Sequence, residues 1–238
     1  MELSNQKILI TGGATGIGWG LTEKFLAEKN TIIICGRRES VLADAKAKHP
    51  DIITKICDVA NFEERNKLYN WIAENHSDLT VLINNAGIQN WMDISDENFF
   101  KKAQEEIKIN IEAPLHLTQL FSKLPNLKTI MNVTSGLSFT PLAKTPVYSA
   151  TKAFFHSLTL SLRYLLKDIE VIEIIPPALN TDLGGIGLHD YAPPVSEFIT
   201  SIFEQLKQGK NELTFGFSEN MLKAGPEELK AAFSRMNP

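Results

Sequence analysis

Tyr148 and Lys152, in the stretch "VYSATKAFF" at 147–155, are the residues whose types and spacing could carry proton chemistry. Four positions apart, their side chains would share one face of a helix. A tyrosine can protonate an oxygen on which negative charge develops, and a lysine cation favours the phenolate that remains. In many amphipathic helices, however, such a tyrosine merely packs and such a lysine is solvated. The elements that could bring a cofactor and a substrate to this face therefore decide what the pair does.

Composition excludes several classes of function. The chain has 238 residues, of which 43% are hydrophobic and 22% charged, as in ordinary soluble globular proteins. Its formal net charge of −4 gives no basic stripe, so we expect no nucleic-acid partner. No apolar run could span a membrane, and a strand-like segment follows the N-terminus with no room for a signal peptide, so we expect a cytoplasmic protein.

Cysteines and histidines give no sign of metal chemistry. Cys35 and Cys57 each end an apolar run and are predicted to be buried in a reducing compartment. The five histidines lack the spacing of metal ligands, so no metal site is expected. His156 is predicted to be a packed or hydrogen-bonded structural residue.

Short β-branched runs alternate with helical patterns along the whole chain. Strands are predicted at 7–11, 31–35, 52–57, 79–84, 128–135, 170–175 and 212–217, and helices at 17–29, 39–48, 62–75, 97–123, 148–166 and 195–208. This alternation predicts an α/β fold: one Rossmann-like domain over 1–238, with a doubly wound parallel sheet of about seven strands and helices on both faces.

A Pro- and Gly-rich segment at 176–194 leaves the carboxyl end of a predicted strand. Ligands of such sheets bind beyond the carboxyl ends of the strands. We therefore predict that this segment, and 183–195 within and just after it, forms a substrate lid.

The stretch "ILITGGATGIGWG" combines a strand, a glycine-rich turn and a helix start. Gly12, Gly16 and Gly18 follow the pattern T-G-x-x-x-G-x-G, and residues without a Cβ allow the backbone to approach a pyrophosphate at a helix N-terminus. Thr15 and Ile17 in the same turn are predicted cofactor contacts. The alternative is that the glycines only permit a tight turn.

The end of the second strand, "CGRR", predicts the choice of cofactor. Gly36 stands where an acid would repel a 2′-phosphate, and Arg37 offers a bidentate partner for one. We predict NADP(H) as the preferred cofactor, with NAD(H) possible, and Arg38 assisting or stacking on adenine. Alternatively, both arginines are solvated. Asp58, with the Val59 backbone beside it, is predicted to accept a hydrogen bond from the adenine amino group.

Three further features complete a resemblance. "NNAG" at 84–87, Ser135 and the Tyr148–Lys152 pair follow the glycine turn in order, and together they resemble the short-chain dehydrogenase/reductase family in its compact single-domain form. The resemblance runs from the first strand to about Thr181. It implies an oxidoreductase that transfers a hydride between a nicotinamide and a carbonyl or secondary alcohol.

The resemblance also implies roles for individual residues. Tyr148 would be the acid/base, Lys152 would bind the nicotinamide ribose, and Ser135 would bond the substrate oxygen. Asn110, in "IKINIEAP", would hold a water that links the lysine to solvent. Cofactor contacts are also implied at Asn85, Ala86, Gly87, Leu179 and Thr181, while Pro177 replaces the family's usual glycine in "PPALNT".

A tyrosine with its usual pKa of about 10 is a poor base at neutral pH. We expect the lysine cation and the oxidised nicotinamide to lower the pKa of Tyr148 to about 7, which requires roughly 4 kcal/mol of differential electrostatics.

The expected substrate is a small or lipophilic neutral carbonyl or alcohol, because the predicted walls are mostly apolar and include no arginine. These walls are Ile88, Trp91, Leu137, Phe139, Leu183 and Tyr191, of which Leu137 is the most direct substrate contact beside Ser135 and Tyr148. Any one of them could instead only pack the base of a loop.

Family members pair through helices that correspond to 103–123 and 149–166, so a homodimer or homotetramer is implied. The C-terminal "AGPEELKAAFSRMNP" resembles the tail of the DltE-like oxidoreductase subgroup. Two rival functions stay open: a nucleotide-binding redox sensor without turnover, and a family enzyme with other chemistry, such as enoyl reduction or epimerisation.

Overall fold

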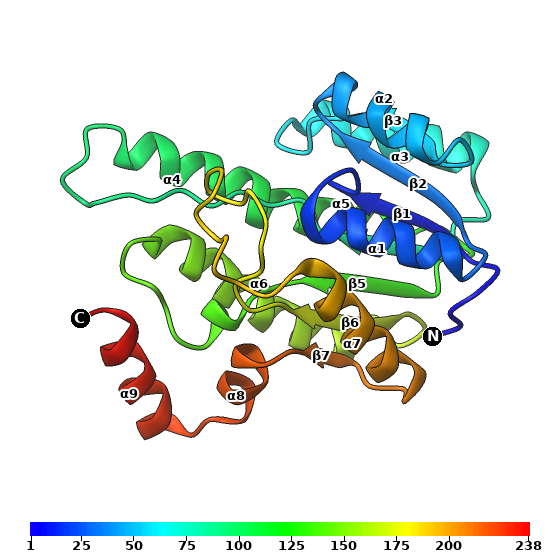
Figure 1. The fold of residues 1–238 in the computed structure, drawn as a ribbon. Coiled ribbons are helices and arrows are strands. Elements are labelled where there is room, and N and C mark those ends of the chain that lie inside the picture. The colour runs from blue at the N-terminus through cyan, green and yellow to red at the C-terminus, as the bar shows by residue number, and fades with distance from the viewer.

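The protein is described by a computed structural model of residues 1–238, built on one sheet of seven parallel strands with helices on both faces (Figure 1). The predicted fold class is confirmed. The sheet order is β3-β2-β1-β4-β5-β6-β7. The strands are β1 (Lys7–Thr11), β2 (Thr31–Gly36), β3 (Ile53–Ile56), β4 (Val81–Asn84), β5 (Thr129–Val133), β6 (Glu170–Ile175) and β7 (Glu212–Thr214).

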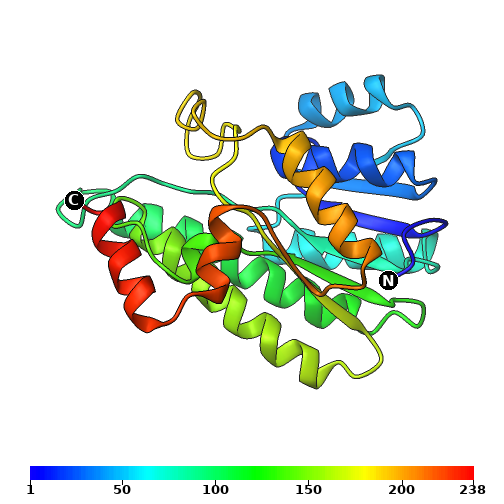
Figure 2. The same cartoon turned by 60° about the horizontal axis from the view of Figure 1, so that its bottom comes forward.

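Helices connect the strands and then complete the C-terminus (Figure 2). They are α1 (Gly16–Ala27), α2 (Glu39–Lys48), α3 (Phe62–Asn75), α4 (Phe99–Ile107), α5 (Ala113–Phe121), α6 (Pro146–Leu165), α7 (Val195–Lys207), α8 (Phe217–Lys223) and α9 (Pro226–Met236). A π-helical turn, Lys108–Glu112, joins α4 to α5, and a 3₁₀ turn, Gly136–Ser138, follows β5.

Both faces of the sheet are buried, which explains the continuously apolar strands. In β1, Ile8 and Ile10 pack into the core beneath α1, α2 and α7, whereas Leu9 between them packs into the core beneath α3 and α5. Side chains alternate between the two faces of a strand, so a strand covered on both sides must be apolar at every position.

The helix predicted at 97–123 is interrupted at Asn110 by the π-helical turn. Pro114 lies at the start of α5. A proline has no N–H, and its ring crowds the carbonyl four residues earlier, which is that of Asn110. One extra residue in the turn relieves this clash, and such π turns are frequent at functional sites.

The C-terminus departs most from the sequence-based prediction. The strand predicted at 212–217 ends at Thr214, because Gly216 adopts a φ of 55° that turns the chain into α8. Neither α8 nor α9 was predicted. Asn237, just beyond α9, donates to the carbonyl of Pro141 (3.1 Å) and accepts from the amide of Ala143 (2.6 Å), which ties the tail to the loop before α6.

Cys35 and Cys57 are free and buried, as predicted. A hydrogen bond between the two thiols, together with burial, raises the pKa of Cys35 well above its usual value. No helix of the fold is long and apolar enough to cross a membrane.

His156 on α6 is a hydrogen-bonded structural residue, as predicted. Its Nδ1 lies 2.9 and 3.0 Å from the two carboxylate oxygens of Glu173, a fully buried residue of β6. The Thr134 hydroxyl donates to the same carboxylate at 2.7 Å. The hydrogen bond with Glu173 raises the pKa of His156 above its usual value.

We expect His156→Gln to destabilise the fold most at acid pH. Because the pKa of His156 is raised in the folded state, its protonation contributes full stability below the unfolded pKa of about 6.5, and this contribution is lost as pH rises through the folded pKa. Urea unfolding should show a deficit of about 1–2 kcal/mol near pH 5 that shrinks toward pH 8.5. The control is His49→Gln, at a more exposed histidine. A deficit independent of pH would contradict this account.

Candidate active site

The glycine turn holds α1 close to the end of β1. Gly12 and Gly16 have φ angles of 64° and 52°, which side-chain-bearing residues rarely adopt. A Cβ on Gly18 would lie 2.3 Å from the carbonyl oxygen of Gly12. Thr15, the N-cap of α1, makes no side-chain capping bond. The amides of the first turn, which include that of Ile17, are therefore left for another acceptor, as an anion site requires.

Thr11 connects the glycine turn to "NNAG". Its hydroxyl oxygen accepts from the amides of Asn85 and Ala86, both at 3.0 Å. The side-chain amide of Asn85 donates back to the carbonyls of Thr11 (2.9 Å) and Gly12 (3.2 Å). The Asn85 side chain thus shapes the predicted cofactor cleft by fixing its backbone. Sequence reasoning missed Thr11, although it is the threonine of the T-G pair.

The predicted adenine end of the cleft is open and cationic. Arg37 and Arg38 are exposed directly after β2. The amide of Cys57 donates to the carbonyl of Gly36 at 3.0 Å, which brings the half-buried Asp58 to the same edge. One Asp58 carboxylate oxygen accepts from the amide of Ala60 (3.0 Å). Val59 is buried, and its carbonyl accepts from Arg65.

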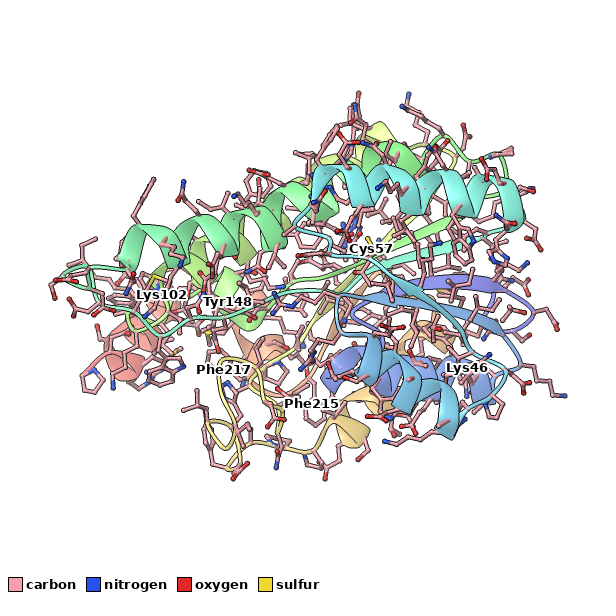
Figure 3. All side chains as sticks on the ribbon, turned by 90° about the horizontal axis from the view of Figure 1, so that it is seen from above. Lys46, Cys57, Lys102, Tyr148, Phe215 and Phe217 are labelled. Carbon is pink, nitrogen blue, oxygen red and sulfur yellow. The ribbon has the colours of Figure 1, made fainter.

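The four predicted catalytic residues are all buried. Tyr148 is 5% exposed, and Figure 3 shows it toward the end of the molecule where Lys102 and α4 lie. The Lys152 ammonium lies 5.6 Å from the centre of the Tyr148 ring and donates to the carbonyl of Val133 at 2.8 Å. The Ser135 hydroxyl oxygen accepts from the amide of Leu137 at 3.1 Å and keeps its own proton to donate.

Asn110 fastens the segment after "NNAG" to α6. Its side chain accepts from the amide of Ile88 (3.0 Å) and donates to the carbonyl of Ile88 (2.9 Å) and to the Thr151 hydroxyl (3.1 Å). A Cβ on Gly87 would lie 3.3 Å from Asn110 Oδ1 and 3.7 Å from Lys152 Nζ. The structure therefore brings Gly87, Asn110 and Lys152 together.

Burial controls the ionisation of the central pair. It raises the pKa of Tyr148 well above its usual value, while the Ser135 hydroxyl acts in the opposite direction and the Glu106 carboxylate raises it further. Burial lowers the pKa of Lys152 from 10.5 to about 8. The expected pKa of about 7 for Tyr148 is therefore not produced by the protein's own groups, because the desolvation of a buried phenolate outweighs them.

The predicted lid is anchored at its base. The amide of Asn180 donates to the carbonyl of Pro193 at 2.9 Å, which closes the two ends of the segment. Leu179 is buried, and Thr181 lies against the glycine turn, since a Cβ on Gly16 would come within 3.5 Å of its methyl group. Pro177, which replaces the family's usual glycine, does not prevent this contact between Thr181 and the glycine turn.

The predicted substrate walls are unequally placed. Ile88, Leu137 and Leu183 are half-buried, and Phe139 packs against the His156 ring at 4.7 Å. Trp91 is partly exposed, and Tyr191 is 79% exposed. Tyr191 lies in a loop that contains three glycines with positive φ, Gly184, Gly185 and Gly187.

Gln89 was missed by sequence reasoning. It is 8% exposed, and its Oε1 has no hydrogen-bond partner. A Cβ on Gly184 of the lid would lie 3.1 Å from this oxygen. The only signal in the sequence is its place two residues after "NNAG".

Comparisons with known proteins match most of the chain to one protein family. A family model described as short chain dehydrogenase matches residues 6–187. The uncharacterized oxidoreductase DltE of Bacillus subtilis (strain 168) is 42% identical, over 100% of this chain and 98% of its own. The predicted resemblance of the C-terminal tail therefore extends to the whole sequence.

Crystal structures show the same fold. A short chain dehydrogenase from Burkholderia cenocepacia J2315 in complex with NADP superposes with a TM-score of 0.86 at 23% identity, over 99% of each chain. A short chain dehydrogenase/reductase from Burkholderia phymatum in complex with NAD gives 0.79 at 16% identity, over 100% of this chain and 97% of that one.

Proposed function

Because the chain belongs to the short-chain dehydrogenase family, we propose that it is an NADP(H)-preferring oxidoreductase that acts on a small or lipophilic carbonyl or secondary alcohol. The observation that carries the proposal is the buried group of Tyr148, Lys152 and Ser135 at the edge of the sheet where the glycine turn also lies. Tyr148 is the acid/base of the reaction.

The residues of the cleft fit a dinucleotide. The uncapped start of α1 and the glycine turn suit the pyrophosphate, and the exposed arginines after β2 suit a 2′-phosphate. Asp58 and the Val59 backbone would hold the adenine, Lys152 the nicotinamide ribose, and Leu179 and Thr181 the carboxamide. When bound, the cofactor supplies the hydride or accepts it.

The protein's own groups perform the proton chemistry. Ser135 would donate to the substrate oxygen, and Tyr148 would protonate that oxygen as negative charge develops on it. Because burial keeps Tyr148 protonated at neutral pH, it is prepared to act as an acid in carbonyl reduction. The Lys152 ammonium favours the phenolate that forms.

We expect Arg37→Ala to raise the Kd of NADPH by about tenfold or more and to leave the Kd of NADH nearly unchanged, because only NADPH carries the 2′-phosphate. Titration of cofactor fluorescence measures both constants. Arg235→Ala, on α9, is the control for loss of a positive charge. Equal effects on the two cofactors, or a wild type that prefers NADH, would make the cofactor assignment wrong.

A panel of neutral ketones, aldehydes and secondary alcohols, followed by NADPH absorbance, tests the proposed activity. We expect at least one carbonyl to be reduced faster with NADPH than with NADH. The result that would overturn the proposal is tight NADPH binding without turnover of any member, which would favour the sensor function.

A homodimer or homotetramer is part of the proposal, with no nucleic-acid partner. Its support is the outer side of α6, which exposes Phe154, Leu160, Tyr164 and Leu165. Such an apolar stripe is typical of helices that pack against another subunit. The cytoplasmic location stays a prediction.

A further inference from the structure

Glu106 is a buried carboxyl group that the proposed chemistry does not use. It is fully buried on α4, one helical turn before Asn110. Carboxylates are rarely buried without a charged partner, because leaving water disfavours the ionised form. Its Oε1 accepts from the amide of Asn90 (2.5 Å) and from the Asn90 side chain (3.2 Å), whereas its Oε2 has no partner.

The packing of α4 against α6 brings the turn that carries Glu106 close to the turn that carries Tyr148. α4 and α6 are in contact and run in the same direction (Figure 1). Asn110 bonds Thr151, the neighbour of Lys152. One turn back along α4 is Glu106, and one turn back along α6 is Tyr148.

No cation neutralises this carboxylate. Charged side chains of the neighbouring segments have other partners. Lys152 donates to the Val133 carbonyl, and Lys102 contacts Asp96 and the Trp91 carbonyl. Lys144 lies over the Trp91 ring, and Asp93 accepts from Ser95. Glu105 and Lys108, on the same helical segment, are exposed. The segment 88–92, which Glu106 holds through Asn90, has no charged residue.

We propose that Glu106 is a positioning residue whose buried carboxylate opposes formation of the Tyr148 phenolate, and so adds to burial in keeping the tyrosine protonated as the proton donor of carbonyl reduction. This inference rests on the proposed function. It gives a residue outside the family's catalytic set an influence on the ionisation of the acid/base. The Glu106 charge raises the pKa of Tyr148. Burial raises the pKa of Glu106 itself from 4.5 to about 7, so the carboxylate is fully ionised only above neutral pH, a range that includes the pH at which a tyrosine titrates.

The test is a titration that needs no substrate. Glu106→Gln keeps an oxygen for the Asn90 amide and removes the charge. Tyrosinate absorbance is measured against pH, with and without NADP⁺, and the same variant carrying Tyr148→Phe is subtracted to isolate Tyr148. We expect tyrosinate to appear about one pH unit or more lower in Glu106→Gln than in the wild type.

Two variants separate charge from structure. Glu105→Gln, the exposed neighbour, should titrate like the wild type, and Glu106→Asp, which keeps the charge, should lie closer to the wild type than Glu106→Gln. Glu106→Met replaces Glu106→Gln if the latter fails to fold. Identical tyrosinate titration curves for the wild type and Glu106→Gln would overturn the proposal. The same holds if neither protein forms detectable tyrosinate at Tyr148.

Thermal unfolding gives a second readout. The pKa of Glu106 is higher in the folded than in the unfolded state. Burial of this carboxyl group therefore does not destabilise the fold below about pH 4.5, where it is neutral in both states, and destabilises it most above about pH 7. The Tm of Glu106→Gln should therefore increase relative to the Tm of the wild type as pH rises from about 4.5 to about 7. A difference in Tm that does not change with pH would contradict burial of the charge. If Tyr148→Phe were fully active, the acid/base role of Tyr148 would fail, and if no carbonyl of the panel were reduced, the proposed function would fail; in either case these two measurements would still decide whether Glu106 controls the ionisation of Tyr148.

Discussion

Replacing Tyr148 with phenylalanine is expected to reduce turnover by about 10³-fold or more and to leave NADPH affinity nearly unchanged. The substitution removes one oxygen, and with it both the proton and a donor that meets the developing negative charge. A loss of this size corresponds to roughly 4 kcal/mol of transition-state stabilisation. Steady-state kinetics with the best carbonyl of the panel, together with NADPH titration, measures the two quantities.

The matched control for this change is Tyr164→Phe on the same helix. Tyr164 is 78% exposed, and it lies four turns beyond Tyr148. It should keep wild-type activity. If Tyr148→Phe also kept that activity, or if its turnover fell only in proportion to weaker NADPH binding, Tyr148 would not be the acid/base.

Replacing Lys152 with methionine is expected to reduce kcat by about 10²-fold and to weaken NADPH binding about tenfold, since one ammonium serves both the ribose and the phenolate. The same variant should be more stable at neutral pH. The pKa of Lys152 is lowered from 10.5 to about 8, so burial of the charge costs about 3 kcal/mol at most below pH 8. This cost disappears as pH rises above 10.5, because the folded lysine is then neutral and the unfolded one is as well.

A loss of activity with a gain in Tm would therefore exclude unfolding as the cause. Lys167→Met, an exposed lysine just beyond α6, should change neither property. Lower stability of Lys152→Met at pH 7 than at pH 10.5, relative to the wild type, would contradict the account of its burial.

The strands and most helices could be predicted because their signal is local. A strand buried on both faces is continuously apolar, and a helix such as α7 begins after Pro194 and stops before Gly209. The glycine turn and the Tyr148–Lys152 spacing are also local patterns. The end of β7 differs from the prediction because a single glycine within an apolar run does not reveal its φ, and the positive φ of Gly216 ends the strand before it.

The remaining features depend on contacts between distant residues. Pro114 causes the π turn at Asn110. The orientation of the Asn110 side chain, however, is fixed by hydrogen bonds with Ile88 and Thr151 on other elements. In the sequence, Glu106 is one of several charged residues on a predicted helix. Its burial depends on the packing of α4 against α6. The raised pKa of Tyr148 follows from burial, which the sequence does not reveal for a single residue.

The most direct test of the central claim is transfer of deuterium from NADPH labelled at the hydride position to the product alcohol, followed by mass spectrometry. We predict that one deuterium appears on the carbinol carbon of the product with the wild type, and that Tyr148→Phe with bound NADPH forms almost none. Bound, labelled NADPH that transfers no deuterium to any carbonyl of the panel would contradict the account and show that the fold binds the cofactor without using it.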